Sequence, residues 1–543
     1  KTTFNASFCL DIRKLGIIKS QKMELQNIES IKNKLDNHNS TLFSNAENSF
    51  TYFVSRIYIK EFRHIKNLEI KFEHPVTVIS GTNKIGKTSI LLLLACSHYE
   101  FLRVDSTKPT STLRRHSWKD VLRFTDYENT TKDYEYHLNW RVGNDTRIGN
   151  SRRLHTSRSW SGVGKTSKDP KRKNAKIKGR EVRFIDLERI LPARNVSNSL
   201  LRKISHSAQT RVNSDIEEAF CYIFSISTGI EIYDIGSHIN KRAFLLKTPT
   251  DNYSSYNAAS GEESVLNILD EIINSPKNSL IIIDELEAGF HPFVQRKIAD
   301  IINYTSWRDK KQFIITTHSP TLISAFSSKS RRFLEPSTDG TSKSINGISV
   351  NAAFSKMDSK AYPLLHLYCE DNIANFILRN LLIKLNQKHS YFDRLVNIIE
   401  SGPANMVKND YERHKRNYSQ MRLKIGYACV FDGDYKNDPH YSHFHLNPNE
   451  HSMFLFPYIA PEKFLLNAYL KEFPNQRIQT SFNISDHHTL FLEMVSEGLA
   501  TDENQALIIC WQSFIKTPEY QSLEKTFNDF ILNAVTDFTI RNE

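Results

Sequence analysis

The stretch from Val76 to Ile90 constrains the fold of this chain more than any other. Its sequence, VTVISGTNKIGKTSI, has an apolar β-branched run before a glycine-rich loop, and an apolar run from Ile90 to Cys96 follows. Strand, glycine loop and helix in this order are typical of a P-loop. Glycines let backbone N–H groups close around phosphate oxygens, and the helix N-terminus favours an anion. A chance glycine turn is the alternative, but the strand and helix on either side favour the P-loop.

The residues of this loop have different expected roles. Lys87 is expected to reach the β- and γ-phosphates of ATP, and the Thr88 hydroxyl is expected to ligate Mg²⁺. The phosphates are expected to lie against the segment that contains Gly81, Asn83, Gly86, Lys87, Thr88 and Ser89.

A second group of motifs lies about two hundred residues further along the chain. Ser260, Gly261 and Glu262 precede a predicted helix, and this helix start is expected to offer N–H donors to a phosphate. The apolar strand Leu280 to Ile283 ends in Asp284 and Glu285. Asp284 is expected to hold Mg²⁺ and Glu285 to polarise the attacking water.

The strand that follows, Phe313 to Thr317, ends at His318. His318 is expected to contact the γ-phosphate. In order and spacing, the motifs resemble the ABC ATPase head, from about Phe53 to Ser327. The resemblance implies a site shared between subunits, so we expect a homodimer or a higher even assembly. One departure is that no Gln occurs between Lys87 and Gln209, where such heads usually carry one.

The length and composition limit the class of protein. At 543 residues the chain is too long for one hydrophobic core, so two or more domains are expected. No apolar stretch reaches the roughly 18 residues that a bilayer span needs, and no secretory signal is visible. For this reason no membrane partner is expected. The six cysteines are scattered without a CxxC pair, which favours a location in the reducing cytoplasm.

Most of the net charge of +12 lies in one segment, residues 151–180, which we call the basic arm. Eleven basic residues against one acidic residue give the arm +10 and leave +2 for the rest. The arm is expected to be an exposed loop, either simply solvated or bound to nucleic-acid phosphates, with Trp160 and His155 stacking on bases. The candidate contacts are Arg152, Arg153, Arg158, Lys171, Arg172, Lys173, Lys176 and Lys178.

Carboxylates follow successive predicted strands in the C-terminal third. Glu370 follows the strand Leu364 to Cys369, and Asp432 and Asp434 follow the strand Tyr427 to Phe431. The carboxyl ends of parallel strands converge, so these acids are expected to hold Mg²⁺ or to be structural. The pattern resembles a Toprim domain, although Ala374 occupies the family's second acidic position.

An ABC head followed by a Toprim-like domain resembles the OLD nucleases, which implies an ATP-regulated, Mg²⁺-dependent DNA nuclease. The runs Cys369 to Asn372 and Pro461 to Leu465 look more like PtuA, the ATPase family of Septu and retron-associated antiphage systems. That resemblance implies an HNH nuclease partner, and in retron versions a reverse transcriptase with its RNA–DNA product. A non-enzymatic SMC-type clamp is the third alternative and the weakest, because the insertion shows no sustained heptads.

The predicted fold is therefore an α/β protein: an ABC/SMC-like ATPase head with a long inserted lobe, a Toprim-like domain and a helical C-terminal region. Leu25, Ile28, Ile31 and Leu35 predict an amphipathic helix that packs on its own domain or binds a partner. The expected domains are residues 1–50 (helical arm), 51–99 and 259–330 (head), 100–258 (lobe with the basic arm), 361–460 (Toprim-like domain, degenerate or intact) and 461–543 (helical region). The C-terminal helices either pack on their own domain or dock the nuclease.

Overall fold

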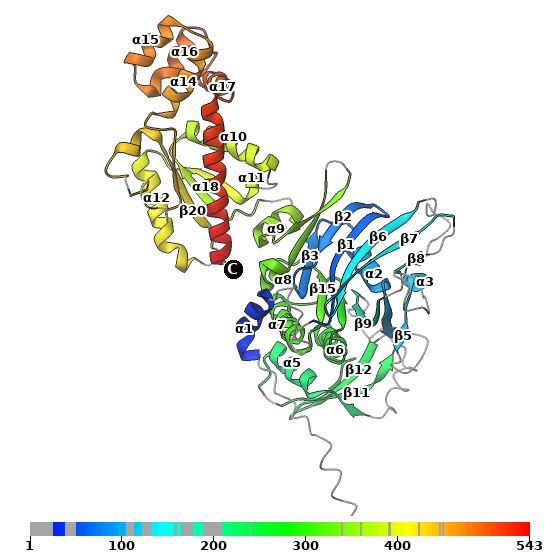
Figure 1. Cartoon of the computed structure of the whole chain (residues 1–543). Helices are drawn as coiled ribbons and strands as arrows, with labels where there is room; N and C mark the ends of the chain where they lie inside the picture. Colours follow the sequence, from blue (N-terminus) through cyan, green and yellow to red (C-terminus); the bar gives the residue numbers. More distant parts are fainter. Residues whose placement is uncertain are drawn as a thin grey trace, which may run out of the picture. The chain divides into compact units, whose positions relative to one another are not determined.

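The structure is a computed structural model that divides into two compact units, Lys1–Ile348 and Ser349–Glu543 (Figure 1). It describes residues 25–37, 50–104, 113–121, 132–156, 160–163, 177–187, 209–227, 229–238, 241–337, 340–358, 361–388, 392–421, 424–441, 443–444, 447 and 450–542. The predicted α/β class and the helical C-terminal region are confirmed.

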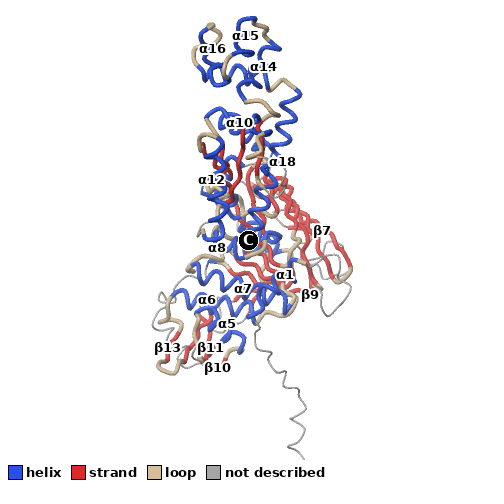
Figure 2. The backbone as a smooth tube through the Cα atoms, turned by 90° about the vertical axis from the view of Figure 1, so that its left-hand side faces the viewer, coloured by secondary structure: helices blue, strands red, loops and turns tan. Residues whose placement is uncertain are grey.

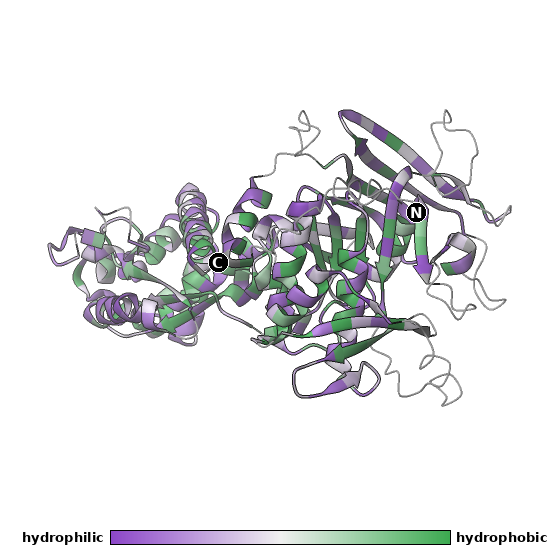
Figure 3. Cartoon of the chain, turned by 90° about the horizontal axis from the view of Figure 1, so that it is seen from below, coloured by the Kyte–Doolittle hydropathy of each residue, from purple (hydrophilic) through white to green (hydrophobic). Residues whose placement is uncertain are grey.

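The first unit is built around an eight-stranded sheet with the order β17-β16-β3-β15-β14-β9-β4-β5. The six inner strands run parallel, and the two edge strands are antiparallel. Its strands are β3 (Val76–Gly81), β4 (His98–Val104), β5 (Leu113–Arg115), β9 (Ile177–Ile185), β14 (Leu280–Ile283), β15 (Gln312–Thr316), β16 (Arg331–Pro336) and β17 (Ser342–Asn346). Every residue of β3, β14 and β15 is buried, because a parallel sheet is covered on both faces. Figure 3 shows the corresponding concentration of hydrophobic colour on these central strands.

Helices cover this sheet. They are α2 (Lys87–Cys96), α5 (Ser214–Phe224), α6 (Ser260–Ile273), α7 (Pro292–Asp309) and α8 (Pro320–Ala325). In Figure 2, α5, α6 and α7 lie together beside a small antiparallel sheet. The strands of that sheet are β10 (Thr210–Arg211), β11 (Glu231–His238), β12 (Lys241–Lys247) and β13 (Asn252–Ser254).

A five-stranded antiparallel sheet with the order β2-β1-β6-β7-β8 joins residues before the P-loop to residues after it. Its strands are β1 (Tyr52–Phe62), β2 (Ile65–Lys71), β6 (Tyr134–Val142), β7 (Asp145–Arg153) and β8 (Trp160–Gly162). The inserted segment also supplies β4 and β9 to the central sheet. The segment predicted as an inserted lobe therefore contributes strands to both of these sheets of the first unit.

The basic arm is not one exposed loop. Its beginning forms the end of β7 and all of β8, and its end forms the start of β9. The high Lys, Arg and Ser content gave no strand signal here, because backbone pairing with β6 and β4 stabilises these strands more than their own composition does. Residues 157–159 and 164–176 of the arm lie outside the described part of the chain.

The amphipathic helix predicted near the N-terminus is present as α1 (Ile28–Asp36), preceded by a 3₁₀ turn (Leu25–Asn27). Ile31 and Leu35 are buried, and Lys32 and Lys34 reach Asp300 and Trp307 of α7. The helix thus packs on its own unit, as the simpler of the two interpretations expects.

The second unit contains a four-stranded parallel sheet with the order β19-β18-β20-β21. The strands are β18 (Leu365–Cys369), β19 (Val396–Glu400), β20 (Gly426–Asp432) and β21 (Ser452–Leu455). Around them lie α9 (Val350–Asp358), α10 (Asn372–Lys388), α11 (Phe392–Leu395) and α12 (Ala404–Asn417). Strand β21 was not predicted, because it is short and lies in a His- and Asn-rich stretch.

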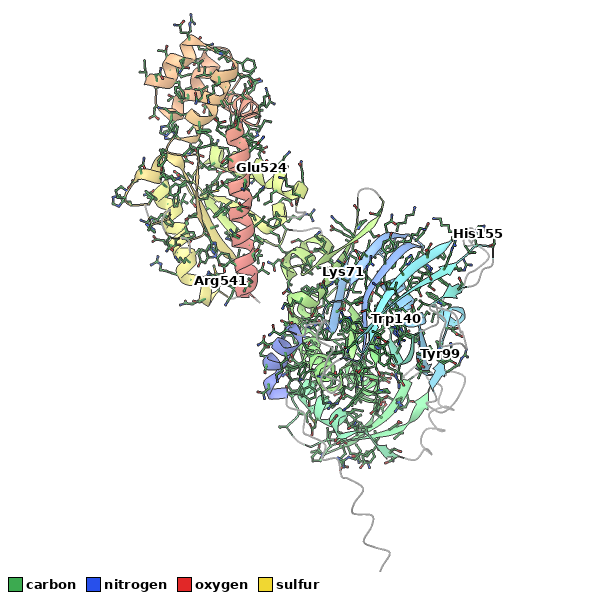
Figure 4. All side chains as sticks on the ribbon, viewed as in Figure 1. Lys71, Tyr99, Trp140, His155, Glu524 and Arg541 are labelled. Carbon is green, nitrogen blue, oxygen red and sulfur yellow. The ribbon has the colours of Figure 1, made fainter. Side chains whose placement is uncertain are left out.

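The rest of this unit is helical: α14 (Pro461–Glu472), α15 (Gln476–Ile484), the 3₁₀ turn η8 (His487–Thr489), α16 (Leu490–Ser496), α17 (Glu503–Phe514) and α18 (Pro518–Asn542). The last helix leaves this group and packs along the sheet, where Phe538 lies against Tyr427 with ring centroids 4.9 Å apart. Figure 4 labels Glu524 and Arg541 near its two ends. Among the described residues, every helix is too short or too polar to cross a bilayer.

Candidate nucleotide site and acidic sheet edge

The backbone of the P-loop requires glycine at two positions. Gly86 has φ +97°, and a Cβ there would lie 2.5 Å from Cδ1 of Ile65 on β2. A Cβ on Gly81 would lie 2.4 Å from the carbonyl oxygen of Leu334 on β16. The loop is therefore clamped between the antiparallel sheet and the central sheet, and any side chain at either glycine would displace it.

Lys87 is the first residue of α2, and its side chain is buried. Its Nζ donates to the carbonyl oxygens of Gly81 (3.0 Å) and Thr82 (3.2 Å), so the ammonium lies inside the loop. Burial lowers the pKa of Lys87 to about 8, and the nearby carboxylates of Glu285 and Asp284 oppose that shift. A buried cation with only carbonyl partners in a glycine loop is well suited to an incoming phosphate.

A hydrogen-bonded chain joins Thr88 in the first turn of α2 to Asp284 and Thr316 at the ends of β14 and β15. The hydroxyl of Thr88 donates to Oδ2 of Asp284 (2.8 Å), and Thr316 donates to Oδ1 of the same carboxylate (2.6 Å). Strand β15 lies between β3 and β14, which places Thr316 between the P-loop and the acid. Thr88 is exposed, and hydroxyl and carboxylate oxygens suit Mg²⁺, so this pair fits the ion.

Glu285 follows Asp284 with the unusual φ of +47°, and its N–H donates to Oγ1 of Thr316 (2.8 Å). The same threonine thus holds the backbone of Glu285 and the side chain of Asp284. A positive φ at a non-glycine residue is a strained geometry that the surroundings must maintain. Thr316 was not singled out from the sequence, although its place at the end of an apolar strand beside His318 was a usable signal.

His318 is half-buried, and its position is set by Glu287. The Glu287 carboxylate accepts hydrogen bonds from the His318 N–H (2.6 Å) and the Thr317 hydroxyl (2.7 Å). Burial and the charge of Lys87 lower the pKa of His318, which favours the neutral imidazole. Glu287 is a positioning residue that sequence reasoning passed over, because it lies in the turn after the strand.

Ser260, Gly261 and Glu262 form the first turn of α6. Ser260 is exposed, and the Glu262 carboxylate accepts a hydrogen bond from the Ala259 N–H at the helix start. A Cβ on Gly261 would lie 3.8 Å from the carbonyl of Gly289, in the turn after Asp284. The helix start is thus open to solvent, beside that turn.

The described residues of the basic arm separate into two groups. Arg152 is exposed, 3.8 Å from Asp133, and Lys178 is half-buried near the ring of Tyr99. Arg153 is only 2% exposed and lies by the ring of Tyr134, so it does not offer its charge to a nucleic acid. Its assignment from the sequence is therefore wrong, because alternate residues of β7 point inward.

The two expected stacking side chains also differ. Trp160 packs on Trp118 with ring centroids 4.1 Å apart, so one face of its ring is covered. His155 is exposed, and Asp133 accepts from its backbone N–H; Figure 4 shows it at the outer part of this sheet. Arg158, Lys171, Arg172, Lys173 and Lys176 lie outside the described residues.

The acids of the second unit converge as expected for parallel strands. Oε1 of Glu370, after β18, accepts a hydrogen bond from the N–H of Asp432 at the end of β20 (2.9 Å). Burial raises the pKa of Glu370 to about 7 and raises that of Asp432 well above its ordinary value. Asp434 contributes a nearby negative charge and is itself exposed.

Oδ1 of Asp432 is buried, and none of the residues that the structure describes forms a hydrogen bond with it. An unsatisfied carboxylate oxygen among several acids is costly unless a cation or proton joins it. The three acids therefore fit a divalent cation. Asp371 has a different role from these three acids. Its carboxylate accepts hydrogen bonds from the N–H groups of Ile373 and Ala374 at the start of α10.

Comparison with known families matches residues 76–324 to the model described as "AAA domain, putative AbiEii toxin, Type IV TA system". The match begins at the P-loop strand and ends in α8, so it covers the P-loop, Asp284 and His318. Among solved structures, the SMC head domain from Thermotoga maritima is 14% identical, with 54% of this chain and 98% of that chain covered and a TM-score of 0.34. The recombination mediator RecF with ATP is 11% identical, with 56% and 98% covered and a TM-score of 0.30.

Proposed function

We propose that the chain is the ATP-hydrolysing subunit of an antiphage defence complex of the Septu or retron type. In this role it assembles with an HNH nuclease effector and controls it. The match of residues 76–324 to an AAA domain supports ATP hydrolysis by this chain. The family description names a toxin of a toxin–antitoxin system, which supports a defence role. The PtuA-like runs around Glu370 and Pro461 support the nuclease partner.

The hydrogen-bonded chain Thr88–Asp284–Thr316 beside buried Lys87 is the observation that carries the proposal. Lys87 would bind the phosphates of the substrate ATP, and Thr88 and Asp284 would hold Mg²⁺, which neutralises phosphate charge. Glu285 would orient or deprotonate the attacking water, and neutral His318 would donate a hydrogen bond to the γ-phosphate. Thr316 holds Asp284 and Glu285 in place, and Glu287 holds His318. The catalytic groups would therefore need little rearrangement during the reaction.

Glu285→Gln tests this assignment. We expect ATP turnover with Mg²⁺ to fall by about 10²- to 10⁴-fold while nucleotide binding remains, because only the general base is lost. Turnover is measured by phosphate release and binding by a fluorescent ATP analogue. Glu29→Gln, at an exposed position of α1, is the matched control and should leave both unchanged. Equal turnover in wild type and Glu285→Gln would remove Glu285 from the mechanism.

The exposed arm residues support binding of nucleic acid, such as the RNA–DNA product of a retron reverse transcriptase. The phosphate contacts in this proposal are Arg152, Arg158, Lys171, Arg172, Lys173, Lys176 and Lys178. Affinity for a double-stranded oligonucleotide should fall steeply with salt. Neutralising Lys171, Arg172 and Lys173 should flatten that slope, whereas an unchanged slope would exclude the arm.

A self-sufficient nuclease of the OLD type is the second candidate, and the unpaired Asp432 oxygen among Glu370 and Asp434 favours it. In this alternative the acids hold Mg²⁺ for phosphodiester cleavage by the chain's own residues. Purified protein with plasmid, Mg²⁺ or Mn²⁺ and varied ATP separates the candidates. Cleavage that is lost in Asp432→Ala supports the second candidate. Cleavage that appears only with an added HNH protein supports the first.

A further inference from the structure

A second group of metal-ligating side chains, none of which is Glu370, Asp432 or Asp434, lies in the helical part of the second unit. Glu462 stands in the first turn of α14 and is only 3% exposed. Its Oε2 is buried and has no hydrogen-bond partner within the described part of the chain. Burying a carboxylate in this way is costly unless a cation compensates its charge.

Two adjacent histidines of η8 face this carboxylate. Nδ1 of His488 lies 3.5 Å from Oε1 of Glu462. One ligand atom from each of Glu462, His487 and His488 lies within 4.8 Å of the others. Nδ1 of His487 lies 3.2 Å from Asp486, which favours a proton on Nδ1 and leaves Nε2 for a metal.

The donors indicate which ions the site would take. Two imidazoles and one carboxylate suit a first-row transition metal such as Zn²⁺, whereas Mg²⁺ prefers oxygen ligands alone. Tetrahedral Zn²⁺ needs ligand atoms roughly 3.3 Å apart, from bond lengths of about 2.0 Å. The ligand atoms lie within 4.8 Å of one another, so side-chain rotation must bring them closer, and the His488 side chain, 69% exposed, has room to rotate.

We propose that Glu462, His487 and His488 form a site for one divalent transition-metal ion, with a fourth position open to water or substrate. Three protein ligands and an open position are typical of catalytic rather than structural zinc sites. Asp371 acts electrostatically on Glu462, and Asp434 acts on His487. The ion would therefore lie near the acids at the carboxyl edge of the parallel sheet. This site is independent of the ATPase site.

Zn²⁺ binding to the full chain tests the proposal. Metal-stripped protein competes with a chromophoric chelator for Zn²⁺, and bound metal is counted by mass spectrometry after dialysis. We expect His487→Ala and His488→Ala each to weaken one tight Zn²⁺ equivalent at least tenfold, with excess Mg²⁺ present throughout. His440→Ala, which removes an exposed histidine outside the group, is the matched control and should bind like wild type.

Glu462→Gln should have the same effect as the histidine variants, but it changes a buried group, so its fold is checked by circular dichroism. The two histidines are more exposed, and their variants keep the test decisive if Glu462→Gln does not fold. Wild-type Zn²⁺ affinity in both histidine variants would overturn the proposal. A second outcome would also overturn the proposal: the double variant Glu370→Gln with Asp432→Asn loses the tight Zn²⁺ equivalent, whereas the histidine variants keep it. The ion would then be bound by the acids at the ends of β18 and β20.

Discussion

Lys87 combines two properties that conflict in the free protein. It must carry a charge to attract phosphate, yet its burial lowers its pKa to about 8. The carboxylates of Glu285, Asp284 and Glu287 and the imidazole of His318 face it. Bound phosphates add negative charge and favour the protonated ammonium, so ATP binding and protonation of Lys87 are coupled.

ATP affinity should therefore fall as the pH rises through the pKa of Lys87. Between pH 7.5 and 9 we expect roughly a five- to tenfold loss, because a growing fraction of the free protein must first take up a proton. The measurement is titration with a fluorescent ATP analogue at fixed Mg²⁺. Lys87→Arg cannot lose its charge in this range, so its affinity should not change with pH. A flat wild-type profile would contradict the coupling.

At the scale of elements, α18 shows how a distant helix completes a sheet. Phe538 fills the space over Gly426, where a Cβ would lie 2.4 Å from its ring. Asp537 accepts from His451 just before β21 (2.8 Å), and Lys388 of α10 reaches Glu524 (2.8 Å). The helix thus packs within its own unit, where Phe527, Ile531 and Phe538 are fully buried, whereas Ile540 near its end is exposed.

Phe538→Ala should destabilise the second unit by about 3–5 kcal/mol, since it removes a fully buried ring and leaves a cavity beside β20. Chemical unfolding of the full chain measures this change in the transition of that unit, because the two units need not unfold together. Ile540→Ala is the matched control on the same helix. Ile540 is 67% exposed, and its loss should change stability by no more than about 0.5 kcal/mol. Equal effects of the two variants would mean that α18 does not pack on the sheet.

At the scale of the whole molecule, we propose from the resemblance to ABC heads that the ATPase site is completed by a second copy of the chain. Each chain has one P-loop and one open helix start at Ser260, and the proposal pairs the P-loop of one copy with the helix start of another. A two-fold symmetric dimer would then contain two equivalent sites.

Mixing two inactive variants tests this pairing. Lys87→Ala should lack phosphate binding, and Ser260→Arg should block the helix start, so each alone should hydrolyse little ATP. In a mixed dimer one site receives the intact P-loop of one chain and the intact helix start of the other. Equal mixing should therefore restore about a quarter of wild-type turnover, since half of the dimers are mixed and each has one working site. No recovery, with dimers present by light scattering, would contradict a shared site.

The local parts of the nucleotide site were predictable from the sequence. Gly86, Lys87 and Thr88 act through backbone conformation and short-range position, which a strand–loop–helix pattern specifies within fifteen residues. Asp284 and His318 were predictable because each ends an apolar strand. The acids Glu370 and Asp432 followed from the same rule, since parallel strands bring their ends together.

Contacts between distant segments could not be predicted in this way. Thr316 links Thr88 to Glu285 because β15 lies between β3 and β14, and strand order depends on packing that local patterns do not encode. Arg153 and Arg152 are neighbours of the same charge, yet pleating buries one and exposes the other. The sequence therefore predicts motifs that lie within one segment. It does not predict contacts between distant residues, such as Glu462 with His488 or Phe538 with Gly426, because these depend on how the chain folds back on itself.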